Sequence, residues 1–265
     1  MQRGDGERTI FITGAGAGIG AATARLFASR GWTVGASDVD VAALEALRGE
    51  VGGDRLHAYT ADVRDPHALQ AAIAAFAEGP GGGRLDAVFA NAGVLYMGPD
   101  ATLTLAQKQL LIDVNVNGVV HTFDAAIPYL LRAAPGARAV AMASTSAEYG
   151  SPQHAVYGAT KFFVRGYTEA LDIEYRRAGL RVSGIYVSYV RTRMVTGANF
   201  RPASVDRLGV KATPEQVANA VWRAVHGSRA HWRVGFDAKL THYAVRLLGA
   251  WIAPIYAKIT GAGTA

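Results

Sequence analysis

Short runs of apolar and β-branched residues alternate along the chain with longer segments in which apolar residues recur every three or four positions. The short runs predict strands at residues 9–13, 33–37, 56–60, 87–90, 138–143, 181–186 and, less regularly, 233–236. The longer segments predict helices at residues 18–30, 40–49, 66–77, 104–132, 153–178 and 214–226. Strands that alternate with helices are joined by right-handed crossovers, so the pattern predicts a doubly wound α/β fold: a seven-stranded parallel sheet with helices on both faces. No linker interrupts the alternation, and we expect a single domain over residues 1–265.

One further apolar stripe lies near the C-terminus. Large apolar residues recur at helical spacing over residues 240–259, which predicts an amphipathic helix at about 239–259 with Pro254 as a place for a kink. The stripe needs a cover, which can be the domain itself, a sister subunit, or a membrane surface beside Arg246 and Lys258. Packing within an oligomer is the simplest of these. The charged residues and Pro254 exclude an integral membrane segment here.

Composition narrows the class of protein. Half of the 265 residues are apolar and 18% are charged, which excludes disorder as the main state. The absence of cysteine excludes disulfides, thiolate metal sites and thiol nucleophiles, and we expect no metal centre. A short polar lead enters the first strand directly and leaves no room for a secretion signal, so we expect a cytoplasmic protein.

The net charge of +6 is distributed unevenly. Residues 1–175 hold 13 basic and 18 acidic groups, whereas residues 176–265 hold 14 basic and only three acidic ones. The basic residues of this C-terminal third can bind nucleic acid, an anionic membrane surface or an acidic ligand, or they can simply face water. Its basic residues stand singly among apolar ones, without a Lys/Arg block, so nucleic acid is the weakest of these partners and we expect none.

Residues 13–20, TGAGAGIG, follow the first predicted strand and open the first predicted helix. Glycines allow a sharp turn there and let a pyrophosphate approach the amides at the helix N-terminus, where the helix dipole favours anions. The spacing of Gly14, Gly18 and Gly20 fits this use, and the first strand–helix unit is where dinucleotide-binding folds place it. A tight turn without a ligand is the alternative interpretation.

Asp38 ends the second predicted strand, 24 residues after Gly14. A carboxylate at this place can accept hydrogen bonds from the adenosine ribose and repels a 2′-phosphate. Because no Lys or Arg stands at positions 15, 17 or 39, the sequence favours NAD over NADP. Capping of the next helix is the alternative role for Asp38, although Asp40 can fill it.

Tyr157 and Lys161 lie four residues apart on a predicted helix and therefore share a face. A free tyrosine has a pKa of about 10, and a neighbouring ammonium stabilises the phenolate and lowers that pKa toward the range useful for acid–base catalysis. Ser144, just past the fifth strand, can donate a hydrogen bond to a substrate carbonyl oxygen, with Ser146 as a competitor for this role. The alternative for the pair is that the aliphatic part of Lys161 only packs on the Tyr157 ring. The alternative for Ser144 is that it caps a helix.

Together these motifs resemble the classical short-chain dehydrogenase/reductase family, from residue 9 to about residue 236. The resemblance implies a Rossmann-type fold and NAD as cofactor. It matches Asp62-Val63 to an adenine contact and Asn91-Ala92-Gly93 to a motif that steadies the sheet beside the cofactor. The cofactor contacts that it implies are Gly14, Ala17, Gly18, Ile19, Gly20, Asp38, Asp62, Val63, Asn91, Ala92, Gly93, Tyr157, Lys161, Val190 and Thr192.

The same resemblance implies an oxidoreductase that interconverts a secondary alcohol and a ketone, with the catalytic residues Asn115, Ser144, Tyr157 and Lys161. Tyr157 would exchange the proton with the substrate, and Ser144 would orient the substrate oxygen. Lys161 would lower the pKa of Tyr157 and hold the nicotinamide ribose, and Asn115 would hold a water that links Lys161 to solvent. The family also implies a homodimer or homotetramer, paired through the helices at 104–132 and 153–178.

One stretch departs from the family pattern. Val187-Ser188 stand where the family usually has Pro-Gly, although Val190 and Thr192 are in place, so the path of the loop beside the nicotinamide differs from the expected one. The resemblance places a substrate lid at about 189–213. We expect the substrate pocket to be lined by Ser144, Ser146, Tyr149, Tyr157 and Tyr189, with His154 nearby.

The lid mixes aromatic residues with several arginines, among them Arg191, Arg193, Arg201 and Arg207. This would suit an apolar alcohol or ketone that carries an anionic group, whereas the simpler interpretation is that these arginines face water. Two other classes of function remain open at this point: an NAD-binding regulator without turnover, and a membrane-surface protein on the same scaffold.

Overall fold

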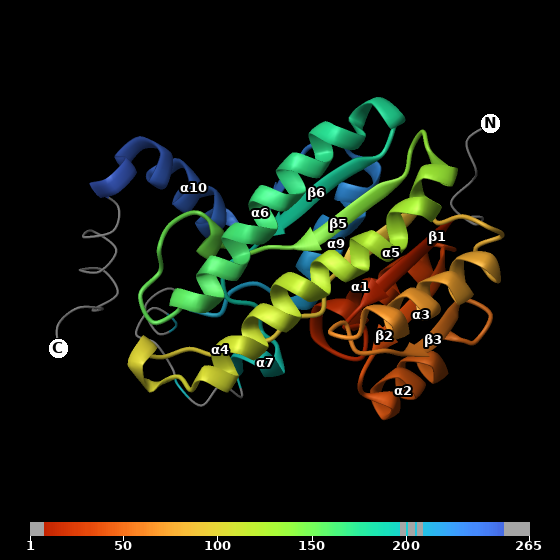
Figure 1. Cartoon of the computed structure of the whole chain (residues 1–265), viewed down its shortest axis with the longest axis horizontal. Helices are drawn as coiled ribbons and strands as arrows, with labels where there is room; N and C mark the ends of the chain where they lie inside the picture. The colour runs from red at the N-terminus through yellow and green to blue at the C-terminus, as the bar shows by residue number, and fades with distance from the viewer. Residues whose placement is uncertain (1–7, 197–199, 201–204, 206–208, 252–265) are drawn as a thin grey trace.

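Seven parallel strands form one sheet in the order β3-β2-β1-β4-β5-β6-β7 (Figure 1). The computed structural model describes residues 8–196, 200, 205 and 209–251. The strand order reverses between β1 and β4, which is where ligands bind in doubly wound folds. The strands are β1 (Thr9–Thr13), β2 (Thr33–Asp38), β3 (Leu56–Thr60), β4 (Ala87–Ala90), β5 (Arg138–Met142), β6 (Arg181–Tyr186) and β7 (His231–Arg233). The predicted Rossmann-type sheet is confirmed.

Helices cover both faces of the sheet. Residues of α1, α2 and α9 belong to the hydrophobic core on one face, and residues of α3, α5 and α6 belong to the core on the other. The helices are α1 (Gly18–Ser29), α2 (Val41–Val51), α3 (Pro66–Glu78), α4 (Leu105–Ile112), α5 (Gly118–Ala133), α6 (Ala155–Tyr175), α7 (Arg193–Thr196), α9 (Pro214–His226) and α10 (Phe236–Leu248). Every helix in the described part of the chain is too short or too polar to cross a bilayer.

Local sequence explains where several helices begin. Thr104 and Thr213 each accept a hydrogen bond from the amide of a glutamine three residues later, and that glutamine reaches back to the cap. Asp65 accepts from the first amides of α3, where Pro66 occupies a position that needs no donor. These caps satisfy amides that would otherwise be unpaired at the helix ends.

Three predicted elements differ in the structure. The helix expected at 104–132 is interrupted by a π-helical turn at Asp113–Asn117, between α4 and α5. The seventh strand is present, but the bounds expected for it, 233–236, are wrong: β7 is His231–Arg233, because Gly235, at φ 87°, turns the chain and Phe236 already opens α10. The C-terminal helix starts earlier than expected and ends at Leu248, where Gly249 takes φ 52°. Residues 252–265, with Pro254 and Lys258, lie outside the described residues.

Candidate active site

A cleft of about 1260 Å³ lies at the carboxyl ends of the strands, around the point where the strand order reverses. Ligand pockets usually measure roughly 300–1,000 Å³, so this cleft has room for a dinucleotide together with a small substrate. Every predicted cofactor or substrate residue lines it except Gly20, and the predicted relay residue Asn115 does not line it either. The structure therefore brings together residues that lie between 14 and 192 in the sequence.

The glycine turn is held against the loop that follows β4. Gly14 and Gly18 take φ values of 65° and 54°, which residues with a side chain rarely adopt. A Cβ at Gly14 would lie 2.7 Å from Ala92 Cα. Asn91 Nδ2 donates to the carbonyl oxygens of Thr13 and Gly14, both at 3.0 Å. The Asn91 carboxamide thus fixes the turn from which the α1 amides face the cleft.

Asp38 lies at the end of the cleft formed by β2 and α2. Its Oδ2 accepts from the Gly16 amide at 2.8 Å, and its Oδ1 accepts from the Asp40 amide at 3.1 Å. The cap of α2 is Asp40, which accepts from the Ala43 amide at 3.0 Å. The capping role considered for Asp38 therefore belongs to Asp40, and the Asp38 carboxylate keeps acceptor capacity toward the cleft.

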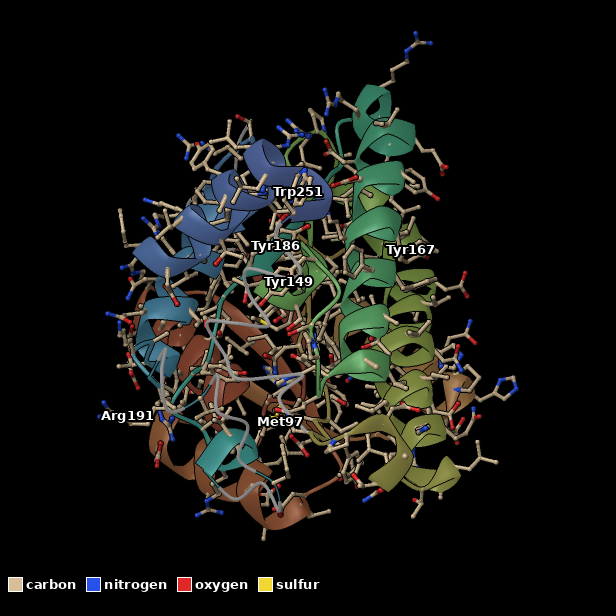
Figure 2. The ribbon with its side chains drawn as sticks, turned by 90° about the vertical axis from the view of Figure 1, so that its left-hand side faces the viewer. Met97, Tyr149, Tyr167, Tyr186, Arg191 and Trp251 are labelled. Carbon is tan, nitrogen blue, oxygen red and sulfur yellow. The ribbon has the colours of Figure 1, made fainter. Side chains whose placement is uncertain are left out.

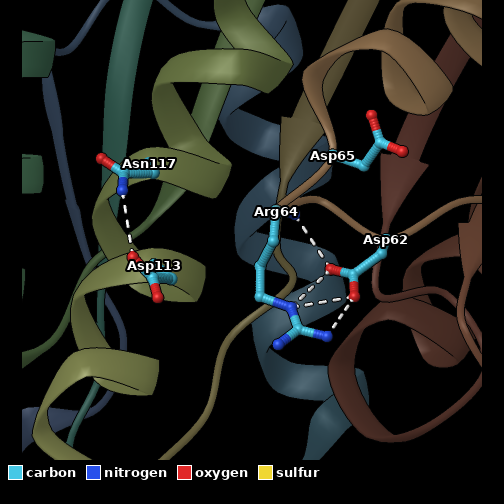
Figure 3. Close-up of a pocket in the computed structure, with 5 residues that line it drawn as sticks. All are labelled: Asp62, Arg64, Asp65, Asp113 and Asn117. Atoms are coloured by element: carbon cyan, nitrogen blue, oxygen red, sulfur yellow. Dashed lines mark hydrogen bonds and ion pairs between the residues drawn. The ribbon is translucent and has the colours of Figure 1, made fainter. Parts of the chain in front are cut away.

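Two arginines at the same end of the cleft are each paired with an acid. Arg25 Nε lies 2.6 Å from Glu50 Oε2. Arg64 binds Asp62 through two nitrogens, and this hydrogen-bonded pair lowers the pKa of the Asp62 carboxyl (Figure 3). Asp62 and Arg64 also border a smaller hollow of about 350 Å³, whose other lining residues are Asp65, Asp113 and Asn117. Among the described residues, no group of three or more acidic or histidine side chains could hold a metal ion.

The predicted catalytic residues Ser144, Tyr157 and Lys161 line one part of the cleft. Ser144 is buried at the end of β5, and its Oγ accepts from the Ser146 amide at 3.1 Å. Tyr157 and Lys161 lie on α6, with Lys161 Nζ 5.6 Å from the centroid of the Tyr157 ring. Lys161 Nζ donates to the Met142 carbonyl at 2.9 Å, so the main chain of β5 fixes the position of the ammonium.

Burial dominates the acid–base properties of this pair. It raises the pKa of Tyr157 to about 12, while a hydrogen bond with Ser144 acts in the lowering direction. Burial also lowers the pKa of Lys161 to about 8. The sequence pattern indicated a tyrosine pKa lowered by its lysine neighbour, whereas in this structure the loss of solvent raises the pKa and Ser144 supplies the lowering contribution.

Asn115 lies in the π-helical turn and is fully buried. Its carboxamide accepts from the Val94 amide and donates to the Val94 carbonyl, both at 2.9 Å. Its Nδ2 is also 3.4 Å from the hydroxyl of Thr160, the neighbour of Lys161. The side chain thus ties the loop after β4 to α6, and π-helical turns of this kind are frequent at functional sites.

The loop after β6 reaches the glycine turn despite lacking Pro-Gly. The Val187 carbonyl accepts from the Thr145 amide at 3.1 Å, and Val190 pairs with Ala212 in an isolated bridge. A Cβ at Gly18 would lie 3.1 Å from Thr192 Cγ2. The Thr192 side chain is therefore packed against the glycine turn.

The residues at the predicted substrate end of the cleft come from the loop before α6, the loop after β6, and the helices α7 and α10. Tyr149, His154 and Tyr189 line the cleft, and the Tyr189 hydroxyl lies 3.4 Å from His154 Nε2. Burial lowers the pKa of His154. The predicted lid contributes Arg193, Met194 and Val195, whereas its Arg201 and Arg207 lie outside the described residues. Sequence reasoning missed the cleft wall that α10 forms with Asp237, Leu240, Thr241 and Ala244.

A buried ionic cluster fastens α10 to the loop that carries Ser144. Glu148 is 2.7 Å from Arg165 Nη1 on α6, 3.1 Å from Arg233 Nη2 on β7 and 3.0 Å from His242 Nδ1 on α10. Burial alone would raise the pKa of Glu148, but the His242 hydrogen bond and the two arginine charges hold it below its usual value. Sequence reasoning missed this cluster, and no local motif marks it.

Comparisons with known proteins agree with this geometry. A family model described as short chain dehydrogenase matches residues 8–201. The chain is 34% identical to the oxidoreductase UcpA of Salmonella typhimurium over 221 residues, 82% of this chain and 80% of the relative. It is 33% identical to the cyclohexanol dehydrogenase of an Acinetobacter species, covering 81% of this chain and 86% of that enzyme.

A solved structure of a 3-ketoacyl-(acyl-carrier-protein) reductase from Brucella melitensis, complexed with NADH, superposes with a TM-score of 0.76 and 28% identity. The match covers 86% of this chain and 96% of that one. The family model spans well over half of the residues, and both curated relatives exceed 30% identity over most of the chain. The chain is therefore an oxidoreductase that belongs to the classical short-chain dehydrogenase/reductase family.

Proposed function

We propose that this enzyme interconverts a secondary alcohol and a ketone with NAD(H) as cofactor. The observation that carries the proposal is that Ser144, Tyr157 and Lys161 line the same cleft as the glycine turn and Asp38. The names of relatives, which include cyclohexanol dehydrogenase and D-threitol dehydrogenase, support an alcohol as substrate.

The glycine turn fits the pyrophosphate of a dinucleotide. A side chain at Gly14 or Gly20 would collide with backbone atoms, so the turn can pack closely only with glycine at these positions. The first residues of α1, Gly18 and Ile19, line the cleft, where their amides could bind a phosphate. When bound, an oxidised nicotinamide supplies the hydride acceptor, which no side chain can be. Lys161, Val190 and Thr192 would hold that half of the cofactor. Asp62 and Val63 would contact the adenine, and the Asn91-Ala92-Gly93 loop would lie beside the cofactor.

Tyr157 would carry the proton at the substrate oxygen. Because burial holds its pKa at about 12, the phenol is protonated at neutral pH and ready to donate in ketone reduction. Oxidation requires the phenolate instead, and the Lys161 ammonium stabilises that charge. With a pKa of about 8, Lys161 stays mainly charged at neutral pH. Ser144 would hold the substrate oxygen beside the phenol, and Asn115 would keep Thr160 and the loop after β4 in place for the proton relay.

The cleft favours NAD over NADP. A 2′-phosphate would meet the Asp38 carboxylate, which is held by the Gly16 amide. The two arginines at this end are already neutralised by Glu50 and Asp62. Neither arginine is left to bind the 2′-phosphate of NADP.

We expect Asp38→Ala to weaken NADH binding by about tenfold or more, since hydrogen bonds to a charged group contribute roughly 1.5–3 kcal/mol. NADPH binding should weaken less or improve, because the repulsion disappears. Fluorescence titration of both cofactors measures this change. Asp40→Ala is the matched control: it removes the cap of α2 and should leave the NADH/NADPH ratio unchanged. Equal affinity of the wild-type enzyme for both cofactors would contradict the assignment.

An absorbance screen for NADH formation, over secondary alcohols, sugar alcohols, steroids and hydroxy acids, tests the proposed function directly. The reverse reaction is screened with ketones and acyl thioesters. Turnover of at least one alcohol or ketone pair is the expected result. Tight NADH binding without turnover of any of them would instead favour the regulatory protein considered from the sequence.

We also propose a homodimer or homotetramer in which the helices within residues 104–132, α4 and α5, and the helix α6 contact their copies across a two-fold axis. Several apolar residues of these helices belong to the core: Leu111, Phe123 and Val164 are fully buried. Other apolar residues of these helices remain exposed, among them Leu105, Ile112, Phe162, Phe163 and Ile173. A closed interface would bury them.

Light scattering at micromolar concentration should therefore report two or four chains. Ile173→Glu, which places a charge at an exposed apolar position of α6, should shift the population toward smaller species. A monomeric wild-type enzyme with full activity would refute the proposed assembly.

A further inference from the structure

The outward side of α10 carries a line of large apolar residues that nothing in the described chain covers. We name it the outer stripe: Phe236, Leu240, Tyr243, Leu247 and Trp251, whose exposed fractions are 79%, 56%, 63%, 85% and 75%. The residues recur at intervals of three or four, so they share one side of the helix and its 3₁₀ extension. Contiguous exposed patches of this kind mark interaction sites.

The outer stripe is not surplus core, because α10 already has a buried face. Ala238 and His242 point into the protein, and His242 joins the ionic cluster around Glu148. A second face, with Asp237, Thr241 and Ala244, lines the cleft. The orientation of α10 is thus set from two sides, and the outer stripe is left on the third.

Basic residues flank the outer stripe. Lys239 and Arg246 are exposed and lie seven residues apart, which places them on the same edge of the stripe. The described part of α10 has one acidic residue, Asp237, and it lines the cleft instead. Residues 176–265 as a whole hold 14 basic groups against three acidic ones. One edge of the outer stripe is therefore basic.

We propose that the outer stripe docks this enzyme onto a membrane surface that contains anionic lipids. A helix with aromatic and leucine side chains on one side and Lys or Arg beside them is the pattern of an interfacial helix, lying in the plane of the headgroups. Trp251 and Tyr243 suit that boundary because each combines an apolar ring with a polar group. Lys239 and Arg246 would meet the lipid phosphates.

The charges disfavour a second copy of the chain as the occupant. A two-fold interface across the stripe in which the two α10 helices run antiparallel would bring two basic edges together, and like charges across an interface oppose association. The apolar surface of α4 and α6 offers a separate place for subunit contact. Figure 2 shows Trp251 at the end of α10 and Tyr167 on α6, on different parts of the molecule. An acidic protein partner would match the charges but not the row of exposed rings and leucines.

Docking would also place the cleft beside the lipid. Leu240 belongs both to the outer stripe and to the cleft wall, so the two surfaces adjoin. If the proposed alcohol–ketone activity holds, an alcohol dissolved in the bilayer would have a short path to Tyr157. The docking itself does not depend on that activity.

Sedimentation with vesicles tests the proposal on the full-length enzyme. Vesicles of phosphatidylcholine with one third phosphatidylglycerol should bind the wild-type enzyme at low salt, and vesicles of phosphatidylcholine alone should bind it much less. Leu247→Ser/Trp251→Ser should weaken binding by at least about tenfold through lost apolar burial. Lys239→Gln/Arg246→Gln should weaken it by about thirtyfold, at roughly fivefold per charge, and should flatten its salt dependence.

A matched control is Val41→Ser/Arg177→Gln, which removes one exposed apolar residue and one exposed charge elsewhere. It should bind vesicles as the wild type does. Far-ultraviolet circular dichroism and NADH binding show whether each variant is folded, whatever its turnover. Absence of binding to the anionic vesicles would overturn the proposal, as would binding that the two α10 variants leave unchanged. A smaller oligomer for Leu247→Ser/Trp251→Ser, without any vesicle binding by the wild type, would assign the stripe to a subunit interface instead.

Discussion

Replacing Tyr157 by Phe is expected to abolish turnover while leaving cofactor binding nearly intact. The phenol oxygen is the proposed proton donor and acceptor at the substrate, and positioned acid–base groups contribute roughly 10²–10⁴-fold to rate. The ring itself is retained, so packing around Lys161 and the cleft wall should persist. Single-turnover hydride transfer, followed by nicotinamide absorbance, gives the rate, and NADH fluorescence gives the affinity.

The control for this change is Tyr167→Phe on the same helix. The Tyr167 ring stacks against Phe123 and Phe163 and does not line the cleft, so its hydroxyl should be dispensable for turnover. If Tyr157→Phe kept more than about a tenth of the wild-type kcat, well above the loss expected for a general acid, the assignment would be wrong.

The direction of the pH dependence follows from the same group. Oxidation needs the phenolate and reduction needs the phenol. For the alcohol, kcat/KM should therefore rise with pH, whereas for the ketone it should stay level until the pH approaches the Tyr157 pKa of about 12. Because the Tyr157 pKa is about 12, the phenolate forms mainly in alkaline solution. The Lys161 ammonium, which stabilises the phenolate, has lost half of its charge at its own pKa of about 8. Any residual turnover of the Tyr157→Phe variant should lack the part of this pH dependence that comes from the Tyr157 phenol.

The features that sequence reasoning predicted well depend on local spacing. The alternation of strands and helices determines the parallel sheet, and the strand ends place Asp38, Asn91 and Ser144 at one edge. Tyr157 and Lys161 share a face because one helix turn separates them. Each of these inferences needs only a short window of sequence.

The features that it missed depend on contacts between distant segments. Glu148 meets Arg233 and His242, which are 85 and 94 residues away, and no periodicity connects them. The cleft face of α10 was missed for a similar reason: Asp237 and Thr241 lie outside the apolar stripe that predicted the helix, and no local pattern connects that helix with the cleft. The π-helical turn around Asn115 leaves the apolar spacing almost unchanged, so it could not be distinguished from a continuous helix.

The pKa of Tyr157 shows a further limit of sequence reasoning. A lysine four residues away is visible in the sequence, but the depth of both side chains is not. The Met142 carbonyl holds the Lys161 ammonium, and burial raises the pKa of the Tyr157 phenol. The burial of the two side chains, and the distance between the Lys161 ammonium and the Tyr157 ring, are therefore known only from the fold.

Replacing Gly20 by Ala should disable the cofactor site although Gly20 itself does not line the cleft. A Cβ at Gly20 would lie 2.1 Å from the Gly14 carbonyl oxygen and 2.8 Å from Asn91 Nδ2. Neither neighbour can retreat easily, because Asn91 Nδ2 is bonded to the carbonyls of Thr13 and Gly14. The methyl group must therefore push the first turn of α1 away from the glycine turn.

Two measurements should follow this displacement. Overpacking of this kind costs about 1–3 kcal/mol of unfolding free energy, more than the roughly 1 kcal/mol that alanine gains over glycine within a helix. NADH affinity should fall by about tenfold or more, since each displaced amide that donates to a phosphate contributes roughly 1.5–3 kcal/mol. Gly49→Ala is the matched control, because a Cβ there meets nothing within 4 Å on α2. It should leave NADH binding unchanged and raise stability slightly, whereas a Gly20→Ala enzyme that binds NADH like the wild type would show that the turn does not hold the cofactor.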